Sequence, residues 1–200
     1  MKTPRTAAVA VSLALLGALA ACGGESDSPA PEVASDAPAP THTDVDASFA
    51  QLMTVHHQTA EEMSGLAEIN GGSQDIKDLA VNITDVRDTE VDAMTWWLKV
   101  WGEESAASAE ANGLDYTSMQ MDGLSPEEVM YQLGGLSGAE FDQRYLELMI
   151  VHHKNANNAA QKEIRDGANG DAIRLAEAIV ATQNEEITTM ETMQTALTGF

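Results

Sequence analysis

The sequence has 200 residues, 32 of them acidic and 10 basic, which gives a formal net charge of −22. A surface of that charge repels a phosphate backbone, which argues against a nucleic-acid-binding protein. The single cysteine excludes an intrachain disulfide framework and a cysteine-based zinc or iron–sulfur site. A hydrophobic content of 44% at this length suits one domain with one core.

Residues 1–21 have the pattern of a bacterial lipoprotein signal peptide. Lys2 and Arg5 precede an almost unbroken apolar run over residues 7–21, which is too short to cross a bilayer as a helix. The run ends in Leu-Ala-Ala-Cys, which resembles the lipobox, whose cysteine becomes the lipidated first residue of the mature protein. We therefore expect an extracytoplasmic protein that is held on the bacterial cell membrane by a lipid on Cys22.

Residues 22–43 are expected to form a disordered tether. They are rich in proline, alanine, serine and acidic residues and contain almost no large apolar side chain, so they cannot bury enough surface to fold. His42 is expected to be a solvated residue of this tether. The folded domain is expected to cover residues 44–200.

The folded domain contains two copies of one sequence pattern. The segment FAQLMTVHHQTA at residues 49–60 matches YLELMIVHHKNA at residues 145–156, and the shift of 96 positions holds without a gap as far as Met94 and Met190. A register that holds over more than fifty residues indicates an internal duplication.

Each copy predicts a hairpin of two helices, over residues 46–102 and 142–198. Apolar residues recur at helical spacing on both sides of a glycine-containing segment. Ser73, and Asp171 or a neighbour, are expected to cap the second helix of each copy. Ser137, followed by Glu140, predicts a capping box at the start of the third long helix.

The segment between the copies predicts a long crossover with one short helix. It contains Ser-Pro-Glu-Glu at residues 125–128, which is typical of a helix start. Two tight hairpins joined by such a crossover predict an all-α fold, a four-helix bundle of ferritin-like shape.

The repeated residues are candidate metal ligands because they lie on helix stripes that otherwise carry core residues. In an antiparallel hairpin, residues equidistant from the turn lie at one level, which places histidine, glutamate and two methionines together in each copy. A buried glutamate is costly unless it is paired or bound to a cation. The candidates are Met53, His56, His57, Glu90, Met94, Met149, His152, His153, Glu186 and Met190.

Adjacent helix residues point about 100° apart, so only one histidine of each pair can point squarely into the bundle. We assign His56 and His152 to the interior. This leaves His57 and His153 facing an adjacent helix, a second ligand position or solvent. Whether the copies form one shared site or two remains open at this point.

The donor types favour a binding protein over an enzyme. Imidazole with thioether suits copper, especially Cu(I), whereas imidazole with carboxylate suits Cu(II), zinc or iron. A diiron carboxylate site is disfavoured because Glu61 and Glu62 correspond to Asn157 and Asn158 in the second copy. No catalytic motif is present at recognisable spacing, so an oxidoreductase ranks third. The main alternative is a metal-free structural or protein-interaction module with a buried His–Glu hydrogen bond in each half and methionines filling gaps.

The doubled Met-x-x-His-His-x-x-Ala pattern, with Glu-x-x-x-Met on the following helix, resembles the domain of unknown function 305 family. The matching segments are residues 53–60 with 90–94 and residues 149–156 with 183–190. The resemblance implies an exported or lipid-anchored protein with a ferritin-like bundle, and it ranks copper above zinc and iron, for sequestration or homeostasis. Met63, which extends the first motif, is Ala159 in the second, so equal binding by the two halves does not follow.

Overall fold

The computed structural model describes residues 41–114 and 120–199, so the expected signal peptide and Cys22 lie outside the described residues. Four long helices, α1 (Asp44–Asn70), α2 (Gln74–Trp101), α5 (Gly138–Asp166) and α6 (Gly170–Thr198), account for most of the described chain. Two short helices, α3 (Ala106–Ala111) and α4 (Pro126–Gly134), lie between the hairpins. The predicted all-helical fold is confirmed. Among the described helices, none is long and apolar enough to span a membrane.

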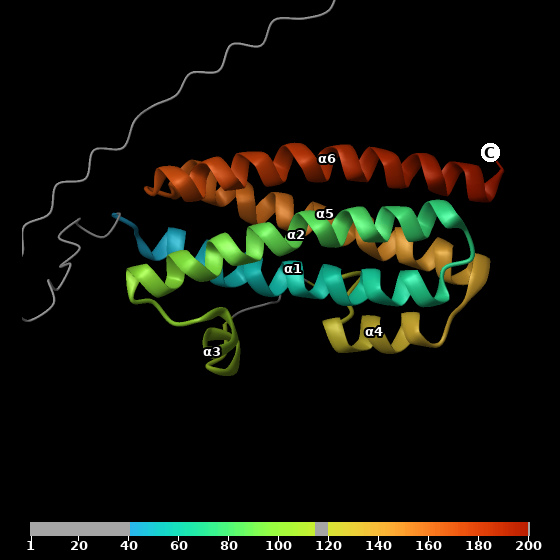
Figure 1. Ribbon diagram of the computed structural model, residues 1–200, viewed down its shortest axis with the longest axis horizontal. Coiled ribbons are helices and arrows are strands. Elements are labelled where there is room, and N and C mark those ends of the chain that lie inside the picture. The colour runs from blue at the N-terminus through green and yellow to red at the C-terminus, as the bar shows by residue number, and fades with distance from the viewer. Residues whose placement is uncertain (1–40, 115–119, 200) are drawn as a thin grey trace, which may run out of the picture. The chain divides into compact units, whose positions relative to one another are not determined.

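The long helices form two antiparallel hairpins, α1–α2 and α5–α6, which meet mainly through α1 and α5 (Figure 1). The helices α3 and α4 both pack against α1, and α4 also touches α5. In Figure 1 the two short helices lie on the same side of the bundle. The crossover therefore covers one face of the bundle.

Several helix starts follow the sequence, and two differ from it. Ser73 caps α2 by accepting a hydrogen bond from the N–H of residue 76, and the capping box at Ser125 forms. Asn169, rather than Asp171, caps α6. Ser137 precedes α5 but its side chain makes no capping hydrogen bond, so that predicted capping box is wrong. Helix α3 was not predicted, although Ser105 caps it.

A pair of buried aspartates ties each hairpin to the turn of the other. Asp46, near the start of α1, accepts hydrogen bonds of 3.0 and 2.7 Å from the backbone N–H groups of residues 168–169 in the α5–α6 turn. Asp142, its counterpart in α5, accepts hydrogen bonds of 2.8 and 3.0 Å from residues 72–73 in the α1–α2 turn. The duplication therefore persists in three dimensions as a reciprocal arrangement of the two hairpins.

Glu163 lies beside Asp46 and breaks this symmetry, because its counterpart in the first copy is Ala67. The side chain is 1% exposed, and neither of its oxygens has a hydrogen-bond donor among the described residues. Burial, followed by the neighbouring Asp46 carboxyl, raises the pKa of Glu163 to about 8. Burial also opposes ionisation of Asp46, but the hydrogen bonds that it accepts from Thr43 and Asn169 outweigh burial and lower its pKa to about 2. We infer a neutral Glu163 beside a charged Asp46 at neutral pH.

The core is divided into two apolar clusters. One contains the second half of α1, the first half of α2, the first half of α5 and the end of α6, and the other contains the remaining halves. Met149 and Met190 belong to the first cluster, and Met53 and Met94 to the second. The four repeated histidines belong to neither cluster and lie between the two clusters along the helices. A polar layer therefore crosses the middle of the bundle.

His42 is not the solvated tether residue expected from the sequence. Its ring stacks on Trp101 with centroids 4.6 Å apart, and its Nε2 lies 2.9 Å from a carboxylate oxygen of Glu103. Residue His42, just before α1, therefore packs against Trp101 at the end of α2. The ordered domain thus begins slightly before residue 44.

Candidate metal centre

The four repeated histidines form one centre where α1 and α5 cross. His56, His57, His152 and His153 are each 0 or 1% exposed. The inward orientation assigned to His56 and His152 is observed. Of the alternatives left open for His57 and His153, contact with the adjacent helix is the one observed, and solvent is not.

His56 and His152 stack face to face across the interface of the two hairpins. Their ring centroids are 3.5 Å apart with an interplanar angle of 16°. The Nε2 of His56 donates to the backbone carbonyl of His152 at 2.9 Å, and the Nε2 of His152 donates to the carbonyl of His56 at 3.0 Å. The two copies therefore build one shared polar centre.

Equal spacing from the turn places His56 level with Glu90 and His152 level with Glu186. In the structure each glutamate instead lies against the second histidine of its copy. His57 Nε2 lies 2.7 Å from Oε2 of Glu90, although the angle falls outside hydrogen-bond geometry. His153 Nε2 makes a hydrogen bond of 2.7 Å to Oε2 of Glu186. Two adjacent histidines differ by only one position in their distance from the turn, so this distance does not decide which of them meets the glutamate.

Arg87 joins the two glutamates and was not anticipated from the sequence. It is 1% exposed, its Nη1 lies 3.3 Å from Oε2 of Glu90, and its Nη2 lies 2.5 Å from Oε2 of Glu186. Its counterpart in the second copy is Gln183, which is also buried and whose side-chain amide has no hydrogen-bond partner among the described residues. Because an arginine and a glutamine do not match, the sequence repeat does not mark this position.

The centre keeps its histidines neutral. Burial, followed by the neighbouring imidazoles, lowers the pKa of His56 and His152 well below the ordinary value. Burial also lowers the pKa of His57 and His153, although their carboxylate partners oppose it. These four imidazoles are therefore neutral at neutral pH, and a neutral imidazole has the free lone pair that a metal requires.

The hydrogen bonds also fix which ring nitrogen has a lone pair. A carbonyl or carboxylate can only accept, so the neutral imidazoles of His56, His152 and His153 carry their proton on Nε2 and leave Nδ1 deprotonated. The Nδ1 atoms of all four histidines are buried and have no hydrogen-bond partner among the described residues. A metal-binding histidine typically donates its other N–H to a carboxylate or a carbonyl, which is the arrangement seen here.

The methionines flank the histidines in two separate groups. Met53, Met94, Met149 and Met190 are all 0% exposed. Each histidine of the stack has a methionine three residues before it on its own helix, which places the two side chains on neighbouring positions of one face. The structure therefore brings histidine, glutamate and arginine together in the middle and leaves one methionine pair on each side.

The described residues contain no group of three or more His, Cys, Asp or Glu side chains arranged to hold a metal ion. A tetrahedral zinc site needs four such ligands, or three and a water. A site for a soft monovalent ion can instead be built from one or two imidazoles together with methionine sulfurs. Methionine is not among the four residue types named above. The donor set therefore fits Cu(I) better than zinc.

A family model for the domain of unknown function DUF305 matches residues 46–194. The protein belongs to the DUF305 family. The match covers both hairpins and the crossover between them, so the family resemblance seen in the doubled motif is confirmed over the whole bundle. No curated protein sequence matches the chain.

Solved DUF305 structures have the same fold. A candidate secreted DUF305 protein from Streptomyces coelicolor is 30% identical, with a TM-score of 0.67 over 76% of this chain and 92% of that chain. A DUF305 fragment from Deinococcus radiodurans is 26% identical, with a TM-score of 0.64 over 78% and 98%. CopM in its Cu(II)-bound form is 25% identical, with a TM-score of 0.62 over 76% and 96%. CopM is also known in a Cu(I)-bound form, at 25% identity and a TM-score of 0.60 over 74% of this chain and 94% of that chain.

Proposed function

We propose that this protein is an extracytoplasmic lipoprotein, anchored through Cys22, that binds copper for sequestration or homeostasis. The observation that carries the proposal is the set of four neutral, buried histidines whose Nδ1 atoms have no partner among the described residues, and three of these histidines also have Nε2 held by an acceptor. An unpartnered polar atom in a protein core is costly, and a bound cation removes that cost. The copper-bound forms of the structural neighbour CopM support copper as the ion.

The ligands would come from the repeated residues of both hairpins. Imidazole and thioether together favour Cu(I) over zinc or iron, and the buried centre would shield the ion from water. The proposed ligands are His56, His57, His152, His153, Met53, Met94, Met149 and Met190. Glu90 and Glu186 act as ligands or hold the adjacent histidines in the orientation seen here. An extracytoplasmic location is supported by the signal-like start of the sequence and by the candidate secreted relative.

Equilibrium dialysis of residues 22–200 against Cu(I) and Cu(II), followed by elemental analysis, tests the proposal. We expect at least one ion to bind with a dissociation constant below micromolar. The double variant His56→Ala/His152→Ala should bind at least 100-fold more weakly, because it removes the stacked pair from both copies.

His42→Ala is the matched control, since it removes the fifth histidine at a distance from the centre. It should bind copper as the parent does. Binding above micromolar for both ions, or equal binding by the double variant, would show that the histidine centre is not a copper site.

Arg87 favours a second candidate, a metal-free module in which the polar centre is structural. Its guanidinium already bridges the glutamates of both copies, so their charge is partly balanced without a metal ion. This candidate predicts that the melting temperature does not change when copper is added. A copper-binding protein is stabilised by its ligand, by about 2.7 kcal/mol at a free concentration of 100 times the dissociation constant.

A further inference from the structure

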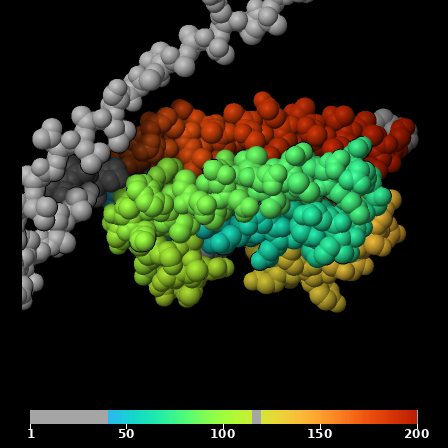
Figure 2. Space-filling view, in the orientation of Figure 1, coloured from blue at the N-terminus to red at the C-terminus, as the bar shows by residue number. Residues whose placement is uncertain are grey.

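A cavity of about 680 Å³ leads from the crossover face of the bundle to the histidine centre. Its walls come from α1, the end of α3, the start of α4 and one residue of α5. In Figure 2 the surface of α1 is visible between α3 and α4, at the lower edge of the bundle. The residue of α5 is His152, one of the two stacked histidines.

The mouth of this cavity is acidic. Glu62, Glu110 and Glu127 line it from three different helices, and each is exposed. None of the described residues that line it is a lysine or an arginine. Carboxylates that converge on a cleft with protein walls raise the local concentration of cations and their rate of association.

The inner wall supplies the second requirement, a donor for the cation. His152 is 1% exposed, and its Nδ1 has no hydrogen-bond partner among the described residues. Met130 on α4 also lines the cavity and offers a thioether whose half-buried side chain is intermediate between the exposed glutamates and the buried histidine. Oxygen donors outside, sulfur next and nitrogen inside form a graded series for a soft cation that sheds its water.

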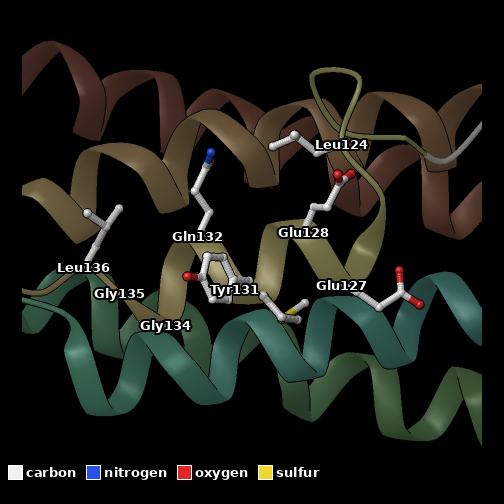
Figure 3. Close-up of a pocket in the computed structure, with 9 residues that line it drawn as sticks. Leu124, Glu127, Glu128, Tyr131, Gln132, Gly134, Gly135 and Leu136 are labelled. Atoms are coloured by element: carbon white, nitrogen blue, oxygen red, sulfur yellow. The ribbon is translucent and has the colours of Figure 1, made fainter.

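A neighbouring cavity along α4 shares Glu127 and Met130 with the first cavity but does not reach the histidine centre. It measures about 840 Å³ and is lined by residues of α4 and its flanks, among them Glu127, Met130 and the exposed Tyr131 (Figure 3). None of the described residues that line it is a histidine. The cavity that reaches His152 is therefore the better route to the centre.

We propose that the cavity between α1, α3 and α4 is the capture site through which Cu(I) reaches the histidine centre, with Glu62, Glu110 and Glu127 attracting the ion and Met130 passing it to His152. This inference rests on the proposed copper function and adds the route to it. The crossover helices pack mainly on α1, so the mouth is built largely beside the first hairpin, although the histidine that it reaches belongs to the second.

The test compares two triple variants of equal charge. Glu62→Gln/Glu110→Gln/Glu127→Gln neutralises the mouth, whereas Glu68→Gln/Asp92→Asn/Glu177→Gln neutralises three exposed acids outside the cavity. Cu(I) in its weak acetonitrile complex is mixed rapidly with each protein at low and high salt, and binding is followed by tryptophan emission. Trp97 lies in the apolar cluster of Met94 and serves as the reporter.

We expect the mouth variant to bind Cu(I) roughly tenfold more slowly at low salt and to lose this difference at high salt. The control triple should differ from the parent less than twofold, and Met130→Leu should slow binding at every salt concentration. Equal rates for the two triples overturn the capture site while the copper function stands. A parent protein that binds no Cu(I) in dialysis overturns both.

Discussion

The two hairpins are nearly equivalent at the residues that form the centre and differ at the residues around it. His56 and His152 exchange the same pair of hydrogen bonds, and Asp46 and Asp142 secure the turns in the same way. In contrast, Arg87 corresponds to Gln183. Duplication therefore accounts for the donor set, and single positions at which the two copies differ set the charge of the centre.

The two copies contribute unequal charge to the centre, because Arg87 of the first copy pairs with the glutamates of both copies. With neutral histidines, Glu90, Glu186 and Arg87 carry one net negative charge. A monovalent ion would neutralise the centre, whereas a divalent ion would leave it positive and buried, which is unfavourable. The asymmetry thus agrees with Cu(I) as the preferred ion.

The largest effect on stability is expected from Arg87→Gln, which makes the first copy like the second. It leaves two nearly buried carboxylates without their cation, so the free energy of unfolding at pH 7 should fall by about 3 kcal/mol or more. Urea unfolding measures this change. Adding Glu186→Gln should recover part of the loss, because it removes one of the orphaned charges.

Arg144→Gln is the control, since Arg144 is partly exposed and binds Asp122, Glu147 and the amide oxygen of Gln132 at the surface. It should cost less than about 1 kcal/mol. An Arg87→Gln loss no larger than that of the control would mean that the bridge between the hairpins contributes little.

The next effect compares the aspartates that secure the turns. Asp46 accepts hydrogen bonds from the α5–α6 turn and also from the N–H and hydroxyl of Thr43, whereas Asp142 accepts only from the α1–α2 turn. Asp46→Ala should therefore lower the free energy of unfolding by about 3 kcal/mol and Asp142→Ala by about 2 kcal/mol. Equal losses, measured by urea unfolding of both variants, would show that the extra bonds to Thr43 add nothing.

The fold could be predicted in its main parts because each part has a local cause. The repeat is visible as a constant shift, and the glycine-containing segments between the two helices of each copy end the first helix, as at Gly71. Helix α3 was missed because six residues rich in alanine carry almost no apolar pattern. The capping box at Ser137 was wrong because Gly138, with a positive φ of 64°, follows it and changes the geometry of the first turn.

The members of the centre could be predicted from the sequence, but their partners could not. Both histidines of each pair are buried because the other hairpin covers the first and the second helix of the same hairpin covers the other, and helix packing alone decides this. The stack of His56 on His152 depends on how the hairpins cross. The burial of Arg87 could not be predicted, because an arginine on a helix is ordinarily exposed.

Glu163 should give the two ends of the bundle different responses to pH. Its pKa is raised from 4.5 to about 8, so its contribution to stability is fully present below pH 4.5 and is lost as the pH rises through 8. Glu163→Gln, which cannot ionise, should melt at a temperature similar to the parent near pH 4.5. At pH 8.5 it should be more stable by about 1 to 3 kcal/mol. Parallel pH profiles of the two proteins, recorded by thermal unfolding, would contradict a buried neutral Glu163; Glu177→Gln, at an exposed site on α6, is the control.

The smallest change in stability, with a clear change in binding, is expected from the methionine pairs on either side of the centre. Leucine has nearly the volume of methionine but no sulfur, so Met53→Leu/Met94→Leu and Met149→Leu/Met190→Leu should each cost less than about 1.5 kcal/mol. Each pair should nevertheless weaken Cu(I) binding about tenfold and leave zinc binding unchanged, because only the soft ion uses the thioether. Dialysis of both variants compares the halves directly, with Met121→Leu as a control for a buried methionine in the apolar cluster of Met149. Unchanged Cu(I) binding by both pairs would assign the methionines to packing alone, whereas a loss confined to one pair would show that the equivalent histidines of the two hairpins belong to unequal sites.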